Sequence, residues 1–246
     1  MTDNNPIDQS ILSIIIPCKN EEAYIGKLLD SIEKQNFDLS NVQIFIADAN
    51  SSDNTIEVIQ SYQKKGKLNI EIIEGGYPAR ARNNGAKRSN AKYLLFLDAD
   101  IQLKEDDFIE TVVNEAEESK MDSVGTLVQS INPNWKDKVI WNSLTGTMYL
   151  YPLIKPFSTG MCIFMRRDKF NELGGFDETI MLGEDVELTK KISRRKFCVV
   201  RRHVLTSNRR FEKMGYVKTM GLYVKTMFSK NFRHQDNAFY FDDVKK

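Results

Sequence analysis

Asp98 and Asp100 are the residues whose type and spacing first suggest chemistry in this chain. They follow directly after the apolar run Tyr93 to Leu97 and are separated by Ala99. Side chains of an extended backbone alternate between two sides, so both carboxylates project the same way. Such pairs bind Mg²⁺ or Mn²⁺ and leave coordination positions open for the phosphate oxygens of a nucleotide. Isolated aspartate pairs also occur in turns and at helix starts, so the surrounding residues must distinguish a metal site from a turn or a helix cap.

Polar residues follow other apolar runs in the same way. The run 12–16 leads into a segment with Asn20 and Glu21, and the run 42–47 leads into Asp48. Short apolar runs rich in β-branched residues are typical of strands covered on both faces. In a doubly wound sheet, ligands bind beyond the carboxyl ends of the strands. We therefore expect these polar residues to meet at one edge of a sheet.

The elements that would position these residues alternate along the chain. Apolar residues recur at helical spacing between the strand-like runs, which predicts an α/β fold with a mostly parallel, doubly wound central sheet flanked by helices. Beyond residue 130 the rhythm changes, and residues 135–151 are expected to form an amphipathic or loop-rich insertion that lies over the sheet. We expect strands at 12–16, 42–47, 70–73, 93–97, 123–128 and 159–165, and helices near 25–32, 56–62, 79–88, 108–116, 168–173 and 184–193.

Composition limits the class of protein. The chain has 246 residues, 41% of them hydrophobic, which is enough for a sizeable core. Its three cysteines are far apart, so neither a disulfide framework nor a zinc knuckle is expected. The first residues lack the features of a signal peptide, and no segment has the roughly 20 apolar residues of a membrane helix. A cytoplasmic setting is therefore the expectation.

The charge distribution is uneven, although the net charge is only +1. Residues 190–246 contain 16 Lys or Arg and 4 Asp or Glu. The segment 216–228 also reads as a basic amphipathic helix. Asymmetry of this kind indicates an anionic partner, such as phosphate, a membrane surface or nucleic acid. A solvated basic face remains the alternative.

Four groups of residues, taken together, resemble the family 2 glycosyltransferases of GT-A fold. The resemblance covers about residues 13–191. It implies a metal-dependent enzyme that moves one sugar from a nucleotide sugar, with UDP favoured, to an acceptor hydroxyl with inversion, in cell-surface glycan or glycolipid synthesis. The groups are Pro17 with Asn20-Glu21; Asp48 with Asn50-Ser51-Ser52-Asp53; Ala81-Arg82-Asn83 and Gly85 ahead of Asp98-Ala99-Asp100; and Gly174-Gly175-Phe176-Asp177-Glu178 ahead of Gly183-Glu184-Asp185.

The resemblance also implies roles on the donor side. Asp100 would bind Mn²⁺ or Mg²⁺, and His203 falls where many GT-A enzymes have a late metal ligand. Arg209 and Arg210 would neutralise the diphosphate. Pro17, Asn20 and Glu21 would frame the nucleoside, Asp48 would accept a hydrogen bond from the base, Arg82 would reach the base or the diphosphate, and Asp98 would lie towards the ribose.

On the acceptor side, Asp185 matches the general base of the family, with Gly183 and Glu184 beside it. A base is needed to take the proton of the acceptor hydroxyl. Acidic residues are favoured at a helix start whatever their function, and this position is expected to lower the pKa of a carboxylate. The partners implied are a nucleotide-sugar donor, a glycan or lipid-linked acceptor, and an anionic membrane at its inner face. No nucleic acid is expected.

The resemblance also suggests how the chain is divided. We expect a flexible N-terminus over residues 1–10, a single GT-A domain over 11–205, and a basic helical C-terminal extension over 206–246. Within the domain, residues 11–128 would form the nucleotide-sugar half and residues 129–205 the acceptor half.

Two departures from the family pattern bear on function. Ala49 stands where a second aspartate often follows the one matching Asp48, so contacts to the base or ribose can differ. No Gln-x-x-Arg-Trp segment of the processive synthases is present, which favours transfer of one sugar.

Other classes of protein compete with the glycosyltransferase. Sugar-phosphate nucleotidyltransferases and dinucleotide dehydrogenases need a glycine-rich loop after the first strand, and residues 17–21 contain no glycine. A nucleotide-sugar-binding pseudoenzyme and a basic module that binds nucleic acid or membrane stay open as non-enzymatic alternatives. The presence of both Asp100 and Asp185 favours an enzyme.

Overall fold

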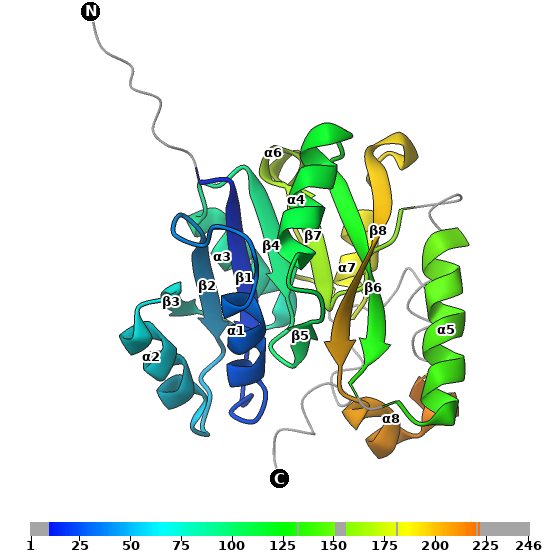
Figure 1. Cartoon of the computed structure of the whole chain (residues 1–246), viewed down its shortest axis with the longest axis horizontal. Coiled ribbons are helices and arrows are strands. Elements are labelled where there is room, and N and C mark those ends of the chain that lie inside the picture. The colour runs from blue at the N-terminus through cyan, green and yellow to red at the C-terminus, as the bar shows by residue number, and fades with distance from the viewer. Residues whose placement is uncertain (1–9, 132, 151–155, 181, 220, 222–246) are drawn as a thin grey trace, which may run out of the picture.

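The short apolar runs form the strands of one sheet, and the segments with helical spacing pack on its two faces (Figure 1). The computed structural model describes residues 10–131, 133–150, 156–180, 182–219 and 221. The elements in chain order are β1 (Leu12–Cys18), α1 (Ile25–Glu33), β2 (Gln43–Asp48), α2 (Thr55–Lys65), β3 (Asn69–Glu74), α3 (Pro78–Arg88), β4 (Tyr93–Leu97), β5 (Ile101–Leu103), α4 (Phe108–Glu118), β6 (Ser123–Ser130), α5 (Trp135–Leu150), β7 (Cys162–Arg166), α6 (Arg167–Glu172), α7 (Glu184–Thr189), the 3₁₀ turn η2 (Arg194–Lys196), β8 (Phe197–Thr206) and α8 (Arg209–Met214).

The sheet has a parallel half and a mixed half. In the described residues its strand order is β3-β2-β1-β4-β7-β6-β8-β5. Strands β3, β2, β1 and β4 are parallel to one another, as predicted. Strand β7 then runs antiparallel to both β4 and β6, β8 is parallel to β6, and β5 is antiparallel to β8. The α/β class and the flanked central sheet are confirmed, with antiparallel pairs confined to the second half.

Two apolar cores cover the two faces of the sheet. Ile14 and Ile16 of β1 pack into the core formed with α1 and α4, whereas Ile15 between them packs into the core formed with α3 and α6. This division follows from the alternation of side chains along a strand. Both faces of β1 are therefore buried, and its loop at the carboxyl end is fixed relative to α1 and α3.

Three segments differ from the sequence prediction. The insertion expected over 135–151 is largely helix α5, at the outer side of the sheet (Figure 1). Strand β8 was not predicted, because Arg201, Arg202 and His203 interrupt its apolar residues. The three-residue strand β5 was also missed, since an element so short has no periodicity to read.

Most of what the sequence predicts for the two ends of the chain cannot be compared with the structure. Of the flexible N-terminus expected over 1–10, residues 1–9 lie outside the described residues, as does most of the expected extension over 206–246. Of the predicted helix 216–228, residues 216–219 are helical. Among the described residues, no helix combines the length and apolar character needed to cross a membrane.

Helix α3 approaches β1 closely because Gly85 faces it. A Cβ added at Gly85 would lie 2.5 Å from Cγ2 of Ile15, well inside van der Waals contact. Helix α3 carries Arg82 and Asn83, both buried, so this close approach fixes how deeply those two polar side chains enter the molecule.

We predict that Gly85→Ala destabilises the chain by about 1–3 kcal/mol, because the added methyl group must displace Ile15 or the helix. Gly146→Ala in helix α5 is the matched control, since no atom lies within 4 Å of its added Cβ. The control should stabilise by roughly 0.5–1 kcal/mol through helix propensity. Chemical unfolding measures both, and equal effects of the two substitutions would contradict the packing argument.

Candidate active site at the carboxyl edge of the sheet

The loops after β1 and β2 are joined to each other by hydrogen bonds. The backbone N–H of Asn20 donates to Ser51 Oγ (2.9 Å), and the N–H of Glu21 donates to Thr55 Oγ1 (2.8 Å). Asn20 adopts a left-handed φ of 53°, which asparagine tolerates better than most residues. Pro17, half-buried near the end of β1, leads into this turn. The two loops therefore form one frame.

Asp48 lies at the end of β2 inside this frame. Its carboxylate accepts hydrogen bonds from the backbone N–H of Ser51 (3.0 Å) and from Ser51 Oγ (2.5 Å). These contacts fix the orientation of the carboxylate. Because an ionised carboxylate has about four acceptor sites, two of them stay available to an N–H group of a ligand.

Arg82 is the central cation of the site. Its side chain is only 3% exposed, and its guanidinium donates to Asp98 (2.8 Å), to Glu184 (2.6 Å) and to the backbone carbonyl of Gly160 (3.1 Å). These partners come from the end of β4, the start of α7 and the loop before β7. A buried cation needs such partners, because an unpaired charge away from water is costly. Arg82 thereby holds three distant segments together.

A second cation, Arg209, lies between two further carboxylates. At the start of α8 its Nη2 contacts Asp100 (3.1 Å) and Glu21 (3.3 Å), and its guanidinium lies over the ring of Tyr24. The other oxygen of Glu21, Oε2, is buried without a hydrogen-bond partner among the described residues. Burial raises the pKa of Glu21 to about 7, with Arg209 opposing the shift and Asp100 adding to it.

Five acidic side chains, which we call the carboxylate cluster, fit a divalent cation. The Arg82 and Arg209 guanidinium groups face five carboxylates, those of Glu21, Asp98, Asp100, Glu184 and Asp185, so negative charge is in excess. The unsatisfied oxygen of Glu21 lies beside Arg209, which occupies the position of a cation between Glu21 and Asp100. No group of three or more metal-binding side chains is preassembled in the described part of the chain. Two carboxylates would leave coordination positions for phosphate oxygens, as hard cations allow.

Asp185 stands at the start of helix α7, beside Glu184. Gly183 ahead of them has a φ of 87°, a left-handed conformation that only glycine adopts without strain. Burial raises the pKa of Asp185 well above the usual range of an aspartate, the Glu184 carboxylate adds to the shift, and Arg82 and the backbone N–H of Val186 oppose it. We expected the helix start to lower this pKa, and that expectation was wrong because burial and Glu184 outweigh the helix.

Glu184 was expected beside the base, on the acceptor side. In the structure its carboxylate is buried and ion-paired with Arg82, and its place on the acceptor side stays a prediction. Adjacent residues on a helix project about 100° apart, so Glu184 and Asp185 face different surroundings. The pairing of Glu184 with Arg82 agrees with the expectation that only one of the two acidic neighbours faces the acceptor.

The Gly174-Gly175-Phe176 segment is held by Asn83. The side chain of Asn83 donates to the carbonyl of Phe176 (2.9 Å) and to Glu178 (2.8 Å), and accepts from the N–H of Phe176 (3.0 Å). Neighbouring Arg82 lies against the ring of Phe176. Two residues of α3 thus position both the carboxylates and the turn that precedes α7.

One predicted residue, His203, lies apart from these groups. His203 lies within β8, where its Nδ1 contacts Glu105 Oε1 (2.8 Å). Strand pairing aligns Ile101 with Thr206, and the N–H of Lys104 donates to the carbonyl of His203. His203 is therefore about four residues, on the order of 13 Å, along the strands from Asp100, so the structure does not bring the two into one metal site. The side chain of Arg210 lies outside the described residues.

Gly160 is a site residue that sequence reasoning missed. Besides accepting from Arg82, it leaves room for Asp185, because an added Cβ would lie 3.0 Å from Asp185 Oδ2. No local motif marks this glycine, since its constraint comes from two residues far away in the sequence. Tyr24, which lies under Arg209, was missed for the same reason.

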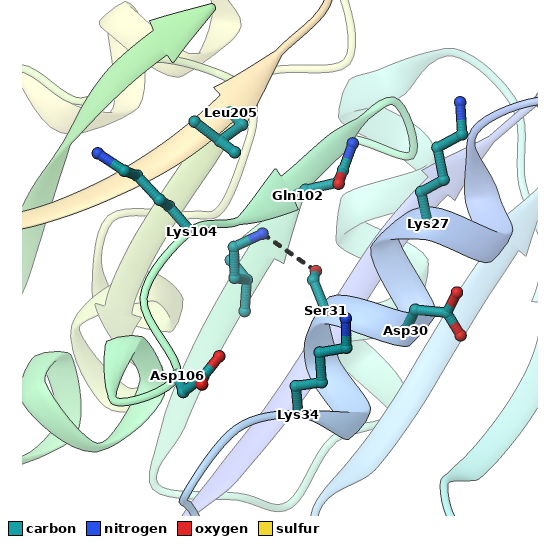
Figure 2. A pocket seen from close by; sticks show the side chains of 9 residues that line it. Lys27, Asp30, Ser31, Lys34, Gln102, Lys104, Asp106 and Leu205 are labelled. Carbon is teal, nitrogen blue, oxygen red and sulfur yellow. Dashed lines mark hydrogen bonds between the residues drawn. The ribbon is translucent and has the colours of Figure 1, made fainter. Parts of the chain in front are cut away.

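A hollow of about 300 Å³ lies outside this site, between α1 and β5 (Figure 2). None of the residues that line it belongs to the carboxylate cluster. Its three lysines, Lys27, Lys34 and Lys104, are largely balanced by Asp30 and Asp106. The hollow therefore has no marked preference for one sign of ligand charge.

The sequence matches one described family over most of its length. The family is Glycosyl transferase family 2, and the match covers residues 13–174. A poly(ribitol-phosphate) beta-N-acetylglucosaminyltransferase, TarS of Staphylococcus aureus, is 33% identical over 36% of this chain and 16% of its own length. A dolichyl N-acetyl-alpha-D-glucosaminyl phosphate 3-beta-D-2,3-diacetamido-2,3-dideoxy-beta-D-glucuronosyltransferase of Methanococcus voltae is 29% identical over 76% of this chain and 63% of its own. The chain thus spans less than two thirds of either relative.

Solved structures share the fold. Staphylococcus aureus TarS in complex with UDP-GlcNAc aligns with a TM-score of 0.63 at 20% identity, over 80% of this chain and 58% of the other. The mannosyltransferase PcManGT from Pyrobaculum calidifontis, in complex with GDP-Man and Mn²⁺, aligns with a TM-score of 0.69 at 14% identity, over 92% and 67%. At these identities the likeness concerns the fold alone.

The raised pKa of Asp185 generates a prediction about stability. A carboxylate whose pKa is higher in the folded than in the unfolded chain stabilises the fold below its unfolded pKa, and this contribution is lost as pH rises through the folded pKa. Asp185→Asn removes the buried charge. The variant should therefore be more stable than the parent at pH 8 by about 1 kcal/mol or more, on the order of 2–4 °C in Tm, and gain much less at pH 5.

Thermal unfolding at the two pH values measures this difference. Asp168→Asn is the control, because Asp168 is an exposed aspartate whose pKa lies below the usual value through its ion pair with Arg166 and the backbone of Lys169. That substitution should not stabilise the chain at pH 8. An Asp185→Asn variant that loses stability at pH 8 would contradict the burial argument.

Proposed function

Because the chain belongs to glycosyl transferase family 2, we propose that it transfers a single sugar from a nucleotide sugar to an acceptor hydroxyl, with inversion at the anomeric carbon. The observation that carries the proposal is the Arg82 guanidinium, which is ion-paired both with Asp98 and with Glu184, the neighbour of Asp185. Residues expected to bind the donor and residues expected to act on the acceptor therefore surround one buried cation.

A uridine diphosphate sugar is the favoured donor. The carboxylate of Asp48 has acceptor sites available and is a suitable partner for the imide N–H of uracil. The complex of TarS with UDP-GlcNAc supports a UDP-sugar, whereas the PcManGT complex with GDP-Man leaves the base to be tested. Residues 11–128 would form this donor half, framed by Pro17 and Asn20.

A divalent cation, Mn²⁺ or Mg²⁺, is part of the proposal. Asp100 and Glu21 are the residues that would hold it, and Arg209, which now contacts both, would turn to the diphosphate. When bound, such an ion stabilises the negative charge of the departing nucleoside diphosphate. A diphosphate approaching the excess of carboxylates without added positive charge would be repelled. The PcManGT complex with Mn²⁺ supports this part of the proposal.

Asp185 would act as the general base. Its raised pKa makes it a stronger proton acceptor than an ordinary aspartate, which suits the weakly acidic hydroxyl of an acceptor. As the acceptor oxygen bonds to the anomeric carbon, the bond from that carbon to the diphosphate breaks. The hydroxyl proton passes to Asp185. Arg82 would orient Asp98 and Glu184 on either side and keep the acidic start of α7 in place.

The acceptor is proposed to be a cell-surface glycan or a lipid-linked sugar, held by residues 129–205. The names of the relatives, a poly(ribitol-phosphate) transferase and a dolichyl phosphate-linked transferase, support these two classes. The expected location, in the cytoplasm at the inner membrane face, is part of this proposal. A nucleotide-sugar-binding pseudoenzyme is less favoured, because binding alone would not require Asp185.

We predict that Asp185→Asn lowers turnover by about 10²–10⁴-fold, since it removes the proton acceptor, while affinity for the donor is retained. Sugar transfer to a competent acceptor and calorimetric binding of the UDP-sugar measure the two quantities. Near-normal turnover of this variant would show that the base lies elsewhere.

Glu184→Gln is the matched comparison. It removes the negative charge that raises the pKa of Asp185, so the acidic limb of the pH profile should move to lower pH. The variant should remain active at pH 8. A profile unchanged in position would mean that Glu184 does not act on the base.

We predict that affinity for UDP falls on the order of tenfold or more when divalent ions are chelated, and by a similar factor in Asp100→Asn with Mn²⁺ present. Calorimetry measures both affinities. Asp106→Asn removes an acidic side chain that is not part of the carboxylate cluster, so this variant should bind UDP as the parent does. Affinity that is unaffected by chelation and by Asp100→Asn would rule out a bridging metal.

A further inference from the structure

An apolar surface patch lies at the amino end of helix α5. The described residues include four large hydrophobic side chains classed as exposed, and three of them are here: Trp135 (72%), Val139 (59%) and Val217 (89%). With Ile140 and Tyr216 they line a shallow hollow of about 460 Å³. We call these five residues the α5 patch. Since most large apolar side chains are buried, this concentration on one surface needs an explanation.

Exposed lysines accompany the patch. Lys138 lies on α5 three residues after Trp135 and next to Val139, so helical spacing places it on the same face. Lys213 and Lys218 are exposed on the segment that carries Val217, where Glu212 is the exposed acidic residue. The surroundings of the patch are therefore predominantly basic.

A buried hydrogen-bond network holds the patch in shape. The carboxylate of Asp137, only 1% exposed, accepts from Tyr216 OH (2.8 Å), from Asn208 (2.6 Å) and from the backbone N–H of Asn134 (2.9 Å). Below it, the ring of Phe211 packs against Trp141 and Tyr216. The segment that carries Val217 is thus tied to the start of α5 by satisfied hydrogen bonds of a buried carboxylate.

The patch is close to the candidate active site. Helix α8 begins with Arg209, which contacts Asp100, and ends at Met214, just before Tyr216 and Val217. A six-residue helix is about 9 Å long, so the patch and the carboxylate cluster are separated by roughly the length of α8. Figure 1 shows α8 at the foot of α5, on the side where β6 and β8 end.

We propose that the α5 patch docks this protein on an anionic bilayer, with Trp135, Val139 and Val217 at the level of the lipid headgroups and the three lysines on lipid phosphates. Tryptophan favours this interface because its ring is apolar and its N–H is polar. Lysines gain affinity from the negative surface potential of the membrane. The inference deepens the proposed function, on which its purpose rests, because docking here would bring a lipid-linked acceptor beside Asp185.

A second copy of the chain fits the patch less well. A stable protein interface takes about 800 Å² and 20–30 residues on each side, whereas the patch offers three exposed apolar side chains. Two copies meeting through this surface would also bring their lysines together. A bilayer needs neither a large complementary area nor an opposing acidic surface.

The first test uses the fluorescence of Trp135 in the full chain. Trp141→Phe leaves Trp135 as the sole tryptophan and keeps an aromatic ring against Phe211. Vesicles of phosphatidylcholine with phosphatidylglycerol should shift the Trp135 emission to shorter wavelength, and brominated lipids should quench it. Phosphatidylcholine vesicles alone should have a much weaker effect. Unshifted and unquenched emission with anionic vesicles would overturn the proposal.

The second test compares variants by vesicle co-sedimentation without donor or acceptor. The double substitution Trp135→Ser and Val217→Ser should weaken binding about tenfold or more, because both side chains lose an apolar environment. Tyr77→Ser removes the other exposed large hydrophobic side chain and should not change binding. Removing Lys138, Lys213 and Lys218 by Gln should weaken binding roughly fivefold per lysine, whereas Lys64, Lys65 and Lys87, replaced likewise on α2 and α3, should have little effect.

All of these variants retain residues 222–246, which carry basic residues of their own. Parental binding by the Trp135 and Val217 double variant would therefore mean that another part of the chain binds the membrane, and would refute the proposal. Self-association of the parent that the double variant lacks, without vesicle binding, would instead identify a dimer interface. UDP affinity and transfer to a water-soluble acceptor should be unchanged in the double variant, so the outcome is separate from that of the proposed function.

Discussion

The buried guanidinium of Arg82 is the interaction on which the arrangement of the site depends. An Arg side chain that is almost wholly removed from water must find carboxylate and carbonyl partners, and these come from β4, α7 and the loop before β7. The close approach of α3 to β1 at Gly85 sets the depth of that side chain. Packing of one helix therefore decides where the donor and acceptor sides meet.

The same arrangement leaves the site with more negative than positive charge. Burial raises the pKa of Glu21 to about 7 and also raises that of Asp185, so the fold keeps carboxyl groups where their charged forms are disfavoured. Such groups reduce the stability of the fold near neutral pH, but the site is stabilised when a cation or a proton binds to them. The proposed activity uses both, a cation near Asp100 and a proton on Asp185.

The sequence prediction was strongest where a residue's environment is set by its near neighbours. The parallel strands from β1 to β4 were predicted from continuous apolar runs, and the family was recognised from motifs at the ends of those strands. It did not identify the partners of Glu184 and His203. Glu184 pairs with Arg82, about a hundred residues away, and no local pattern indicates that pairing. His203 follows a register between β5 and β8 that no local pattern reveals.

The sequence by itself determined the α/β class, the strand ends that carry polar residues, and the family, because these depend on periodicity and on spacing along the chain. Only the tertiary structure decided which carboxylate pairs with Arg82, which lies against Arg209, and that Gly160 packs closely against Asp185. It also decided that Trp135 and Val217, distant in sequence, form one exposed surface around Asp137. Charges, burial and close contacts of this kind are set by groups brought together in space, and a one-dimensional pattern does not contain those distances.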